Sequence, residues 1–186
     1  GREISPVEQK IYILLNKPRD IITTLSNKKS RKSIHDILKG KVSTHVFPVG
    51  RLDRDTTGLL LITNDGDLTK RLSHPSYEVK KIYHATLNKP MSDEDLNKIR
   101  SGLQLEDGFI KVDGISFVKN APPTELGITL HSGRNRIIRR IFEYVGYDVV
   151  KLDRVYYAGL TKKDLPRGRM RDLTREEVIR LKHFKV

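Results

Sequence analysis

The chain has 186 residues and a formal net charge of +13 at pH 7, from 36 Lys and Arg against 23 Asp and Glu. That length is enough for one well-cored domain, and a field of that sign favours a polyanionic partner, nucleic acid above all. The absence of Cys excludes disulfides and thiolate metal sites, and no run reaches the roughly 18 apolar residues that a membrane-spanning helix needs. No secretory signal is visible, so we expect a cytoplasmic protein with no membrane partner.

The first third of the chain alternates short apolar runs with polar turns. Residues 1–10 show no period and are expected to form a linker tail. Because the chain begins with Gly1 rather than Met, we expect it to be a piece of a longer protein. Apolar, β-branched runs predict strands, and capping residues with stop signals predict helices. Strands are expected at 11–16, 21–25, 46–49 and 59–62, and helices at 33–38 and 67–72, with Asp67 as the N-cap of the second helix and a polar loop at 26–32.

The remainder of the chain continues in the same manner, with Ser92 and Thr174 as expected N-caps and with Gly102 and Gly146 as helix ends. Strands are expected at 79–87, 110–118, 125–132, 149–152 and 154–158, and helices at 92–101, 135–145 and 174–181. Because strands and helices do not alternate regularly, the order predicts an α+β fold with a mixed, mostly antiparallel sheet. No internal linker divides residues 11–186, which we expect to form one domain with two lobes.

A loop with two carboxylates and two arginines precedes the apolar strand expected at 59–62. The acids are Asp53 and Asp55, and the bases are Arg51 and Arg54. A buried strand holds such a loop in a fixed pose, and a carboxylate beside a guanidinium stays ionised, which suits a nucleophile. An Asp in a turn before a strand is also a common solvated turn former. The residues alone do not choose between Asp53 and Asp55.

A second, distant arginine cluster lies on the helix expected at 135–145. Its apolar residues share one arc of the helical wheel, which predicts that this arc docks on the sheet. The other arc carries Arg136, Arg139 and Arg140, and Arg134 follows a Ser-Gly pair just before the helix. A helix start surrounded by guanidiniums suits a phosphate or a carboxylate, and a solvated basic face is the alternative.

Weaker signals come from the remaining polar and aromatic residues. Tyr83 lies among lysines on the strand expected at 79–87, where it is either a half-buried core residue or a platform for an unstacked base. Spacing alone favours the core. The six His show no metal-ligand spacing, and no Gly-rich phosphate loop is present, so we expect neither a metal nor a nucleotide cofactor.

Four blocks of the sequence, taken in order, resemble the pseudouridine synthases of the small-subunit type, which modify ribosomal RNA. The blocks are residues 14–18, 49–66, 81–83 and 133–146, and the tail from 152 to 176 fits as well. The second and fourth blocks are the specific ones. The resemblance implies a mixed sheet with flanking helices around a central cleft, with no metal and no organic cofactor. The implied partner is ribosomal RNA, with large-subunit RNA favoured over small-subunit RNA, and we expect a monomer.

The resemblance also implies a role for individual residues. Asp53 would be the nucleophile, and Arg139 would form the ion pair that orients it. Tyr83 would stack on the target uracil, Ile138 would pack beside the base, and Arg51 would lie near the flipped nucleotide. Contacts to the RNA backbone are expected from Lys17, Lys81, Arg134, Arg136 and Arg140.

Two positions depart from the family pattern: Asp20 stands where Gly is usual, and Ile137 stands where Gln is frequent. A small RNA-binding domain of the ribosomal-protein S4 type often precedes the catalytic domain in this family. That domain is not part of the sequence, in keeping with the expectation of a longer protein.

The implied reaction breaks the N-glycosidic bond of a uridine, turns the uracil and bonds C5 to C1′ of the same ribose. A base within a stem would first be flipped out, at roughly a few kcal/mol. Attack of Asp53 at C1′, attack at C6 and elimination through C2′ all stay open. One competing interpretation is a non-catalytic RNA-binding module, in which Asp53 is dispensable. Another is a glycoside hydrolase, for which Asp53 and Asp55 in a basic loop are a poor pair of acids.

Overall fold

The computed structural model describes residues 9–23, 32–42 and 45–183. Its strands are β1 (Tyr12–Lys17), β2 (Phe47–Pro48), β3 (Thr56–Thr63), β4 (Lys81–Leu87), β5 (Leu103–Leu105), β6 (Gly108–Ile110), β7 (Gly114–Phe117), β8 (Glu125–Leu130), β9 (Val149–Tyr157), β10 (Leu160–Thr161) and β11 (Met170–Asp172). Within the described residues, nine of these form one mixed sheet in the order β11-β1-β3-β9-β4-β8-β7, with β2 paired to β3 and β10 paired to β9. The strands β5 and β6 form a separate hairpin.

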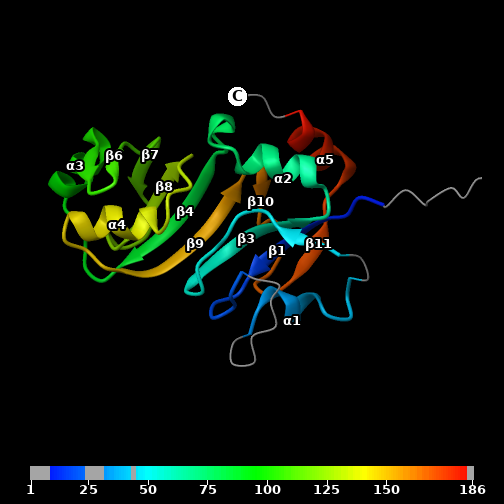
Figure 1. Cartoon of the computed structure of the whole chain (residues 1–186). Helices are drawn as coiled ribbons and strands as arrows, with labels where there is room; N and C mark the ends of the chain where they lie inside the picture. The colour runs from blue at the N-terminus through cyan, green and yellow to red at the C-terminus, as the bar shows by residue number, and fades with distance from the viewer. Residues whose placement is uncertain (1–8, 24–31, 43–44, 184–186) are drawn as a thin grey trace, which may run out of the picture.

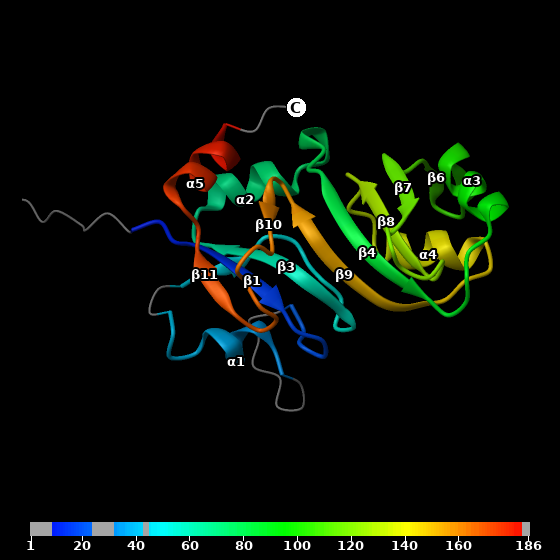
Figure 2. The same cartoon turned by 180° about the vertical axis from the view of Figure 1, so that it is seen from behind.

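The helices are α1 (Ile34–Leu38), α2 (Gly66–Ser73), α3 (Asp93–Ser101), α4 (Ile137–Tyr144) and α5 (Arg175–Lys182), with a short 3-10 helix at Pro75–Tyr77. The sheet runs through two lobes (Figure 1). In the first lobe α2 and α5 lie on one face of the sheet and α1 lies on the other. In the second lobe α3 and α4 lie on one face. Seen from behind, the long strand β9 lies between β3 and β4 and joins the lobes (Figure 2).

The apolar run of β3 is explained by the layers on both of its faces. Leu59 and Leu61 belong to the core cluster under α2 and α5, whereas Leu60 and Ile62 belong to the cluster that includes α1. All four side chains are fully buried. The sequence of a strand covered on both faces is continuously apolar, whereas a strand covered on one face alternates apolar and polar residues. This strand is therefore a rigid mount for the loop that precedes it.

The strands β3 and β9 meet in a parallel pairing that begins where this loop ends, and we call it the β3–β9 seam. Thr56 pairs with Leu152, and Gly58 pairs with Arg154. The other strand pairs of the described sheet are antiparallel. Gly58 has a φ of +115°, and a Cβ built on it would lie 2.2 Å from the backbone oxygen of Arg154. Only glycine permits so close an approach of the two backbones.

The expected α+β class and the mostly antiparallel mixed sheet are confirmed, whereas several element boundaries are corrected. The strands expected at 149–152 and 154–158 are one strand, β9, and the strand expected at 110–118 is split into β6 and β7. Ile22 makes only an isolated bridge with Ser33, and residues 24 and 25 of that expected strand lie outside the described residues, as do residues 1–8 of the expected tail. The strand expected at 46–49 shrinks to the two residues of β2.

The N-cap of α2 is Asp65 rather than the expected Asp67. The Asp65 carboxylate accepts hydrogen bonds from the backbone N–H of Leu68 at 3.1 Å and from the hydroxyl of Tyr12 at 2.6 Å. A carboxylate that satisfies the third N–H of a helix must precede the first turn, and Asp67 already lies within it. The expected N-caps Ser92 and Thr174 are confirmed, because each accepts a hydrogen bond from the backbone three residues on.

Candidate active site

The loop between β2 and β3 holds Asp53 through hydrogen bonds of its backbone. The carbonyl of Asp53 accepts a hydrogen bond from the N–H of Thr56 at 3.0 Å. The hydroxyl of Thr23 accepts from the N–H of Leu52 at 3.2 Å and donates to the carbonyl of Leu52 at 2.5 Å. A turn fixed at both ends holds Asp53 in place, and its side chain is 32% exposed.

The turn after β1 supports the same loop and corrects one expected RNA contact. Asp20 adopts a left-handed conformation with φ 66°, which Asp tolerates better than most residues, and its N–H donates to the carbonyl of Arg54 at 2.8 Å. Lys17 is fully buried, and its ammonium donates to the carbonyls of Pro18 at 3.0 Å and Arg54 at 3.5 Å. Burial lowers the pKa of Lys17 to about 8. This lysine braces the loop from inside the fold, and its side chain does not reach the surface of the described structure.

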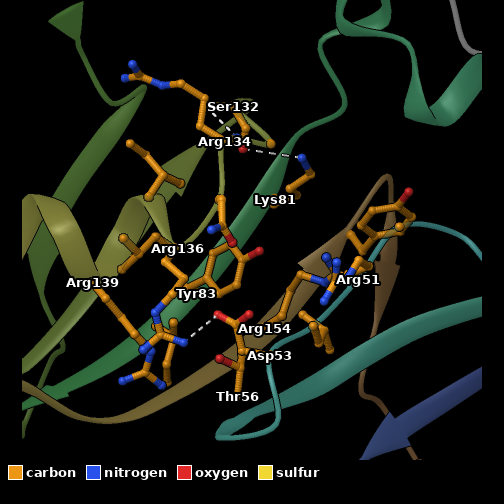
Figure 3. Close-up of a pocket in the computed structure, with 18 of the residues that line it drawn as sticks. Arg51, Asp53, Thr56, Lys81, Tyr83, Ser132, Arg134, Arg136, Arg139 and Arg154 are labelled. Atoms are coloured by element: carbon orange, nitrogen blue, oxygen red, sulfur yellow. Dashed lines mark hydrogen bonds and ion pairs between the residues drawn. The ribbon is translucent and has the colours of Figure 1, made fainter. Parts of the chain in front are cut away.

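A cavity of about 560 Å³ lies between this loop, the strands β4 and β9, and the segment that leads into α4 (Figure 3). That volume is within the usual range for a small-molecule site. It brings together residues from all the expected blocks except the first: Arg51, Asp53, Lys81, Tyr83, Arg134, Arg136, Ile138 and Arg139. Asp55 instead lines a second cavity of about 270 Å³ with Thr57 and His84. The geometry therefore separates the two acids that the sequence left equivalent.

Asp53 forms its ion pair with Arg136, not with the expected Arg139. The Arg136 Nη1 lies 3.2 Å from Asp53 Oδ2 and 3.7 Å from Asp55 Oδ1. Arg136 precedes the first turn of α4 in a left-handed conformation, with φ 51° and ψ 32°. A residue without the freedom of glycine is strained in that region, and such strain is concentrated at functional sites. The backbone at Arg136 thus directs a guanidinium onto the Asp53 carboxylate.

Arg139 lies deeper and holds the other acid of the loop. Its side chain is 8% exposed, and its Nη2 lies 3.4 Å from Asp55 Oδ2. The same guanidinium donates to the carbonyls of Val149 at 3.1 Å and Asp55 at 3.4 Å. Burial lowers the pKa of Arg139, against the opposing effect of Asp55. The helical wheel placed Arg139 on the solvent arc, but the structure buries it. One carboxylate and two carbonyls contact its Nη atoms, whereas its Nε has no partner within the described residues.

Tyr83 and Ile138, which are far apart in the sequence, together form an apolar wall of the cavity. Tyr83 lies on the face of β4 that points toward the core of the second lobe, where it is half-buried. Ile138 lies in the first turn of α4 and is buried. In Figure 3 the Tyr83 ring and the Asp53 carboxylate point into the same cavity. An aromatic ring beside an aliphatic side chain suits a flat, unstacked base.

Three polar residues of the cavity were missed or only partly recognised from the sequence. Arg154 of β9 is 3% exposed, and its Nε donates to the carbonyl of Leu59 at 2.8 Å. Thr56 is 3% exposed, and its hydroxyl has no hydrogen-bond partner in the described structure, nor has Nη2 of Arg154. Lys81 was expected to bind RNA, and burial together with Arg154 lowers its pKa to about 8. Reading β9 as one strand would have placed Leu152 and Arg154 on one face.

Two arginines at the edge of the cluster, Arg134 and Arg140, form ion pairs with an acid that the sequence analysis did not single out. Asp107, in the turn between β5 and β6, pairs with Arg140 at 2.8 Å and with Arg134 at 3.3 Å. Arg140 does not line the main cavity but a neighbouring depression with Asp107 and Glu143. These two expected RNA contacts therefore lie at the rim, each with a carboxylate already beside it.

Behind the seam, Asp153 forms a compact network on the opposite face of β9. Its carboxylate accepts hydrogen bonds from Lys162 at 2.7 Å, Thr57 at 2.8 Å and Arg167 at 2.9 Å. Burial alone would raise the pKa of Asp153, but the hydrogen bonds from Arg167, Lys162 and Thr57 lower it to about 2. This network ties β3 and β9 to the segment after β10.

The described residues contain no group of three or more His, Asp or Glu that could hold a metal ion. In the same part of the chain, no helix is both long and apolar enough to cross a membrane.

Comparisons with known proteins show the family to which the chain belongs. Residues 11–144 match the family of RNA pseudouridylate synthases. The chain is 41% identical, over 94% of its length and 72% of the relative, to the ribosomal large subunit pseudouridine synthase B of Bacillus subtilis. It is 37% identical, over 97% of its length and 61% of the relative, to the dual-specificity RNA pseudouridine synthase RluF of Salmonella typhi.

A solved structure described as a pseudouridylate synthase superposes with a TM-score of 0.82 and 26% identity, covering 94% of this chain and 75% of that one. The human RNA pseudouridylate synthase domain containing 1 shares the fold, with a TM-score of 0.56 at 14% identity over 90% of this chain and 80% of that one. The family match over most of the chain, together with these relatives, establishes the class of enzyme. The chain belongs to the RNA pseudouridine synthases, which are isomerases.

Proposed function

We propose that this enzyme converts a specific uridine of large-subunit ribosomal RNA to pseudouridine, with Asp53 as the nucleophile. The observation that carries the proposal is the shared cavity of Asp53, Tyr83 and Ile138, which Asp55 does not line. A carboxylate beside a flat, apolar slot can act on a base held in that slot. The relative from Bacillus subtilis supports the choice of RNA, because its name specifies the large ribosomal subunit.

The reaction is an isomerisation, so every atom of the uridine is kept. The C1′–N1 bond breaks, the uracil turns within the cavity, and a C1′–C5 bond forms; C5 loses its proton, and N1 gains one. The uracil must not escape while it is detached, and Tyr83 stacked on it with Ile138 beside it would retain it. Arg51, at the mouth of the cavity, would contact the flipped nucleotide. An ionised Asp53 is the electron-rich group in each of the three possible first steps.

The two inner arginines take different parts in this proposal. Arg136 would orient the Asp53 carboxylate, because its guanidinium lies 3.2 Å from it. Arg139 would position the loop from behind through Asp55 and the carbonyl of Val149. Lys81, Arg134 and Arg140 would contact the RNA backbone, whose negative charge suits the basic surface around the cavity. We further propose a cytoplasmic monomer that acts without metal or organic cofactor.

The matched substitutions Asp53→Asn and Asp55→Asn test the nucleophile. Both remove one negative charge from the same loop, but only Asp53 lines the base cavity. Asp53→Asn should lower the single-turnover rate by about 10⁴-fold or more, as for the loss of other nucleophiles, while RNA affinity changes little. Asp55→Asn should lose far less. Near-normal turnover by Asp53→Asn would refute the assignment and favour a protein that only binds RNA.

The substrate is tested by mapping pseudouridine in total ribosomal RNA from cells with and without the gene. We expect one or a few large-subunit sites to disappear with the gene and to return with the wild-type enzyme but not with Asp53→Asn. Sites that disappear only from small-subunit RNA would contradict the proposed substrate while leaving the proposed nucleophile intact.

A further inference from the structure

Cations that face the main cavity differ in whether an acid neutralises them. Arg136, Arg139 and Arg134 each pair with an Asp of the chain. Lys81 and Arg154 have no carboxylate partner within the described residues, although both line the cavity, where Arg154 is buried and Lys81 is half-buried. Buried charges in proteins are ordinarily paired. A buried and a half-buried cation that line one cavity, neither with an acid beside it, suit an anion from outside the chain.

Two contacts hold the Arg154 guanidinium in place, but they do not satisfy all of its N–H groups. Its Nε donates to the carbonyl of Leu59 at 2.8 Å, and its central carbon lies 4.5 Å from the centre of the Tyr157 ring. Its Nη2 is buried and has no acceptor in the described part of the chain. The residue as a whole is 3% exposed. Because Nη2 is closed off from solvent, the part of the guanidinium that a ligand oxygen can meet is the part that lines the cavity, and the contacts to Leu59 and Tyr157 hold that part in place.

Lys81 approaches the same wall from β4 and is also incompletely satisfied. Its ammonium has two long contacts, at 3.4 Å to the carbonyl of Ser132 and at 3.5 Å to the carbonyl of His131. Carbonyl oxygens reduce the cost of burying the charge but do not neutralise it. The proximity of Arg154 adds like-charge repulsion, which is one of the causes that lower the pKa of Lys81. An anion between the two would relieve that repulsion.

The chemistry of the ligand follows from these charges. A uracil ring is neutral, so it would leave both cations uncompensated. A phosphodiester carries one negative charge and two unbridged oxygens that accept hydrogen bonds from different directions. We propose that Lys81 and Arg154 form a seat for a backbone phosphate of the same nucleotide whose base enters the cavity. The proposal rests on the proposed function in one respect, that this cavity receives an RNA uridine.

Such a seat would do what a contact at the rim cannot. It would anchor the flipped nucleotide by its own phosphate, so that the ribose is fixed relative to Asp53 while the detached uracil turns. Fixing the ribose removes motions that would otherwise have to be lost in the transition state.

The test compares the binding of uridine, uridine 5′-monophosphate and uridine 3′-monophosphate by NMR titration of the wild-type enzyme and variants. Wild type should bind one of the two monophosphates about tenfold or more tightly than uridine, as expected for a charge-assisted contact. Arg154→Gln and Lys81→Met should each bring that ratio close to one while keeping the affinity for uridine. Arg154→Lys, which keeps the charge, should retain most of the ratio.

Arg100→Gln is the matched control. Arg100 also donates to a backbone carbonyl, that of Ile115, and has no carboxylate partner in the described structure, but it lies on α3 away from the cavity. It should leave the ratio unchanged. If Arg154→Gln fails to fold in a thermal melt, Lys81→Met decides, because its ammonium has no short internal contact to lose.

The proposal is overturned if wild type shows no preference for either monophosphate, or if the preference survives in both neutral variants. It is also overturned if Arg154→Gln weakens uridine and monophosphates equally, since the guanidinium would then serve the base or the fold. Failure of the nucleophile assignment gives a different result. In that case Asp53→Asn retains turnover, while the preference for the monophosphate stays where it was.

Discussion

Arg136 pairs with Asp53, and Arg139 pairs with Asp55. These two pairs differ in burial, which leads to a prediction about substituting each arginine by glutamine. The Arg136–Asp53 pair is open to water, with side-chain exposures of 43% and 32%. Pairs of that kind contribute about 0.2–1 kcal/mol, so Arg136→Gln should lower the free energy of unfolding by less than about 1 kcal/mol. Arg139 is 8% exposed and holds one carboxylate and two carbonyls.

Breaking a buried pair costs about 3–5 kcal/mol. Asp55, the partner of Arg139, is 38% exposed, and water can satisfy part of its charge. We therefore expect Arg139→Gln to lower the free energy of unfolding by a smaller amount, about 2–3 kcal/mol. For the turnover of folded enzyme, Arg136→Gln should have the larger effect of the two substitutions. It should lower kcat by about 10²-fold, as for the loss of one polar contact to a reacting group.

Urea denaturation gives the free energies of unfolding, and single-turnover kinetics at saturating RNA gives the rates. The reasoning is refuted if Arg139→Gln unfolds like wild type but loses turnover, while Arg136→Gln keeps full turnover. That result would mean that Arg139 takes over Asp53 when RNA binds and that the pairing described above belongs to the free enzyme only.

Three further outcomes follow from the seam and its surroundings. Gly58→Ala should lower the free energy of unfolding by about 3 kcal/mol or more, because its Cβ would lie 2.2 Å from the Arg154 oxygen. Gly127→Ala, whose Cβ would be 3.9 Å from its nearest neighbour, should change it by less than about 1 kcal/mol in the same urea titration. Asp153 has its pKa lowered from 3.8 to about 2, so its contribution of about 2 kcal/mol is present above pH 3.8 and is lost as the pH falls toward 2. In Asp153→Asn that loss has already occurred, and melting temperatures should depend less on pH over this window. Lys81 loses its charge as the pH rises through about 8, so RNA affinity should fall there in wild type but stay level in Lys81→Met, as filter binding would measure.

Local signals predicted much of this fold because they depend on neighbours in the sequence. Ser92 and Thr174 cap helices through bonds to the backbone three residues on, and the run before Ile62 is apolar because both faces are covered. The strand expected at 21–25 is wrong where it is described, because β-branched residues near Ile22 find no neighbouring strand beyond one bridge. The division of β9 at Asp153 was wrong because a polar network, not a turn, accounts for that acid.

The site was predictable as a set of segments but not as a set of contacts. Resemblance to the family led to Asp53 and Tyr83, and both line the cavity. The partner of Asp53 depends on the left-handed backbone at Arg136, which helical periodicity cannot reveal. Lys17 is basic and lies in a family block, but its burial depends on carbonyls brought together by the turn after β1. Arg154 lies in the tail that fits the family, but no role was implied for it, and its place in the β3–β9 seam is what brings it into the cavity.

The position of β9 has a consequence for how the chain is made. This strand is synthesised after β3 and β4, yet it is inserted between them in the sheet. Until it emerges, the inner edges of both earlier strands lack their neighbour, and the floor carrying Leu152 and Arg154 does not exist. A nascent chain that already contains Asp53, Tyr83 and Arg136 therefore has no place to receive a nucleotide, and it exposes two strand edges that other chains could pair with.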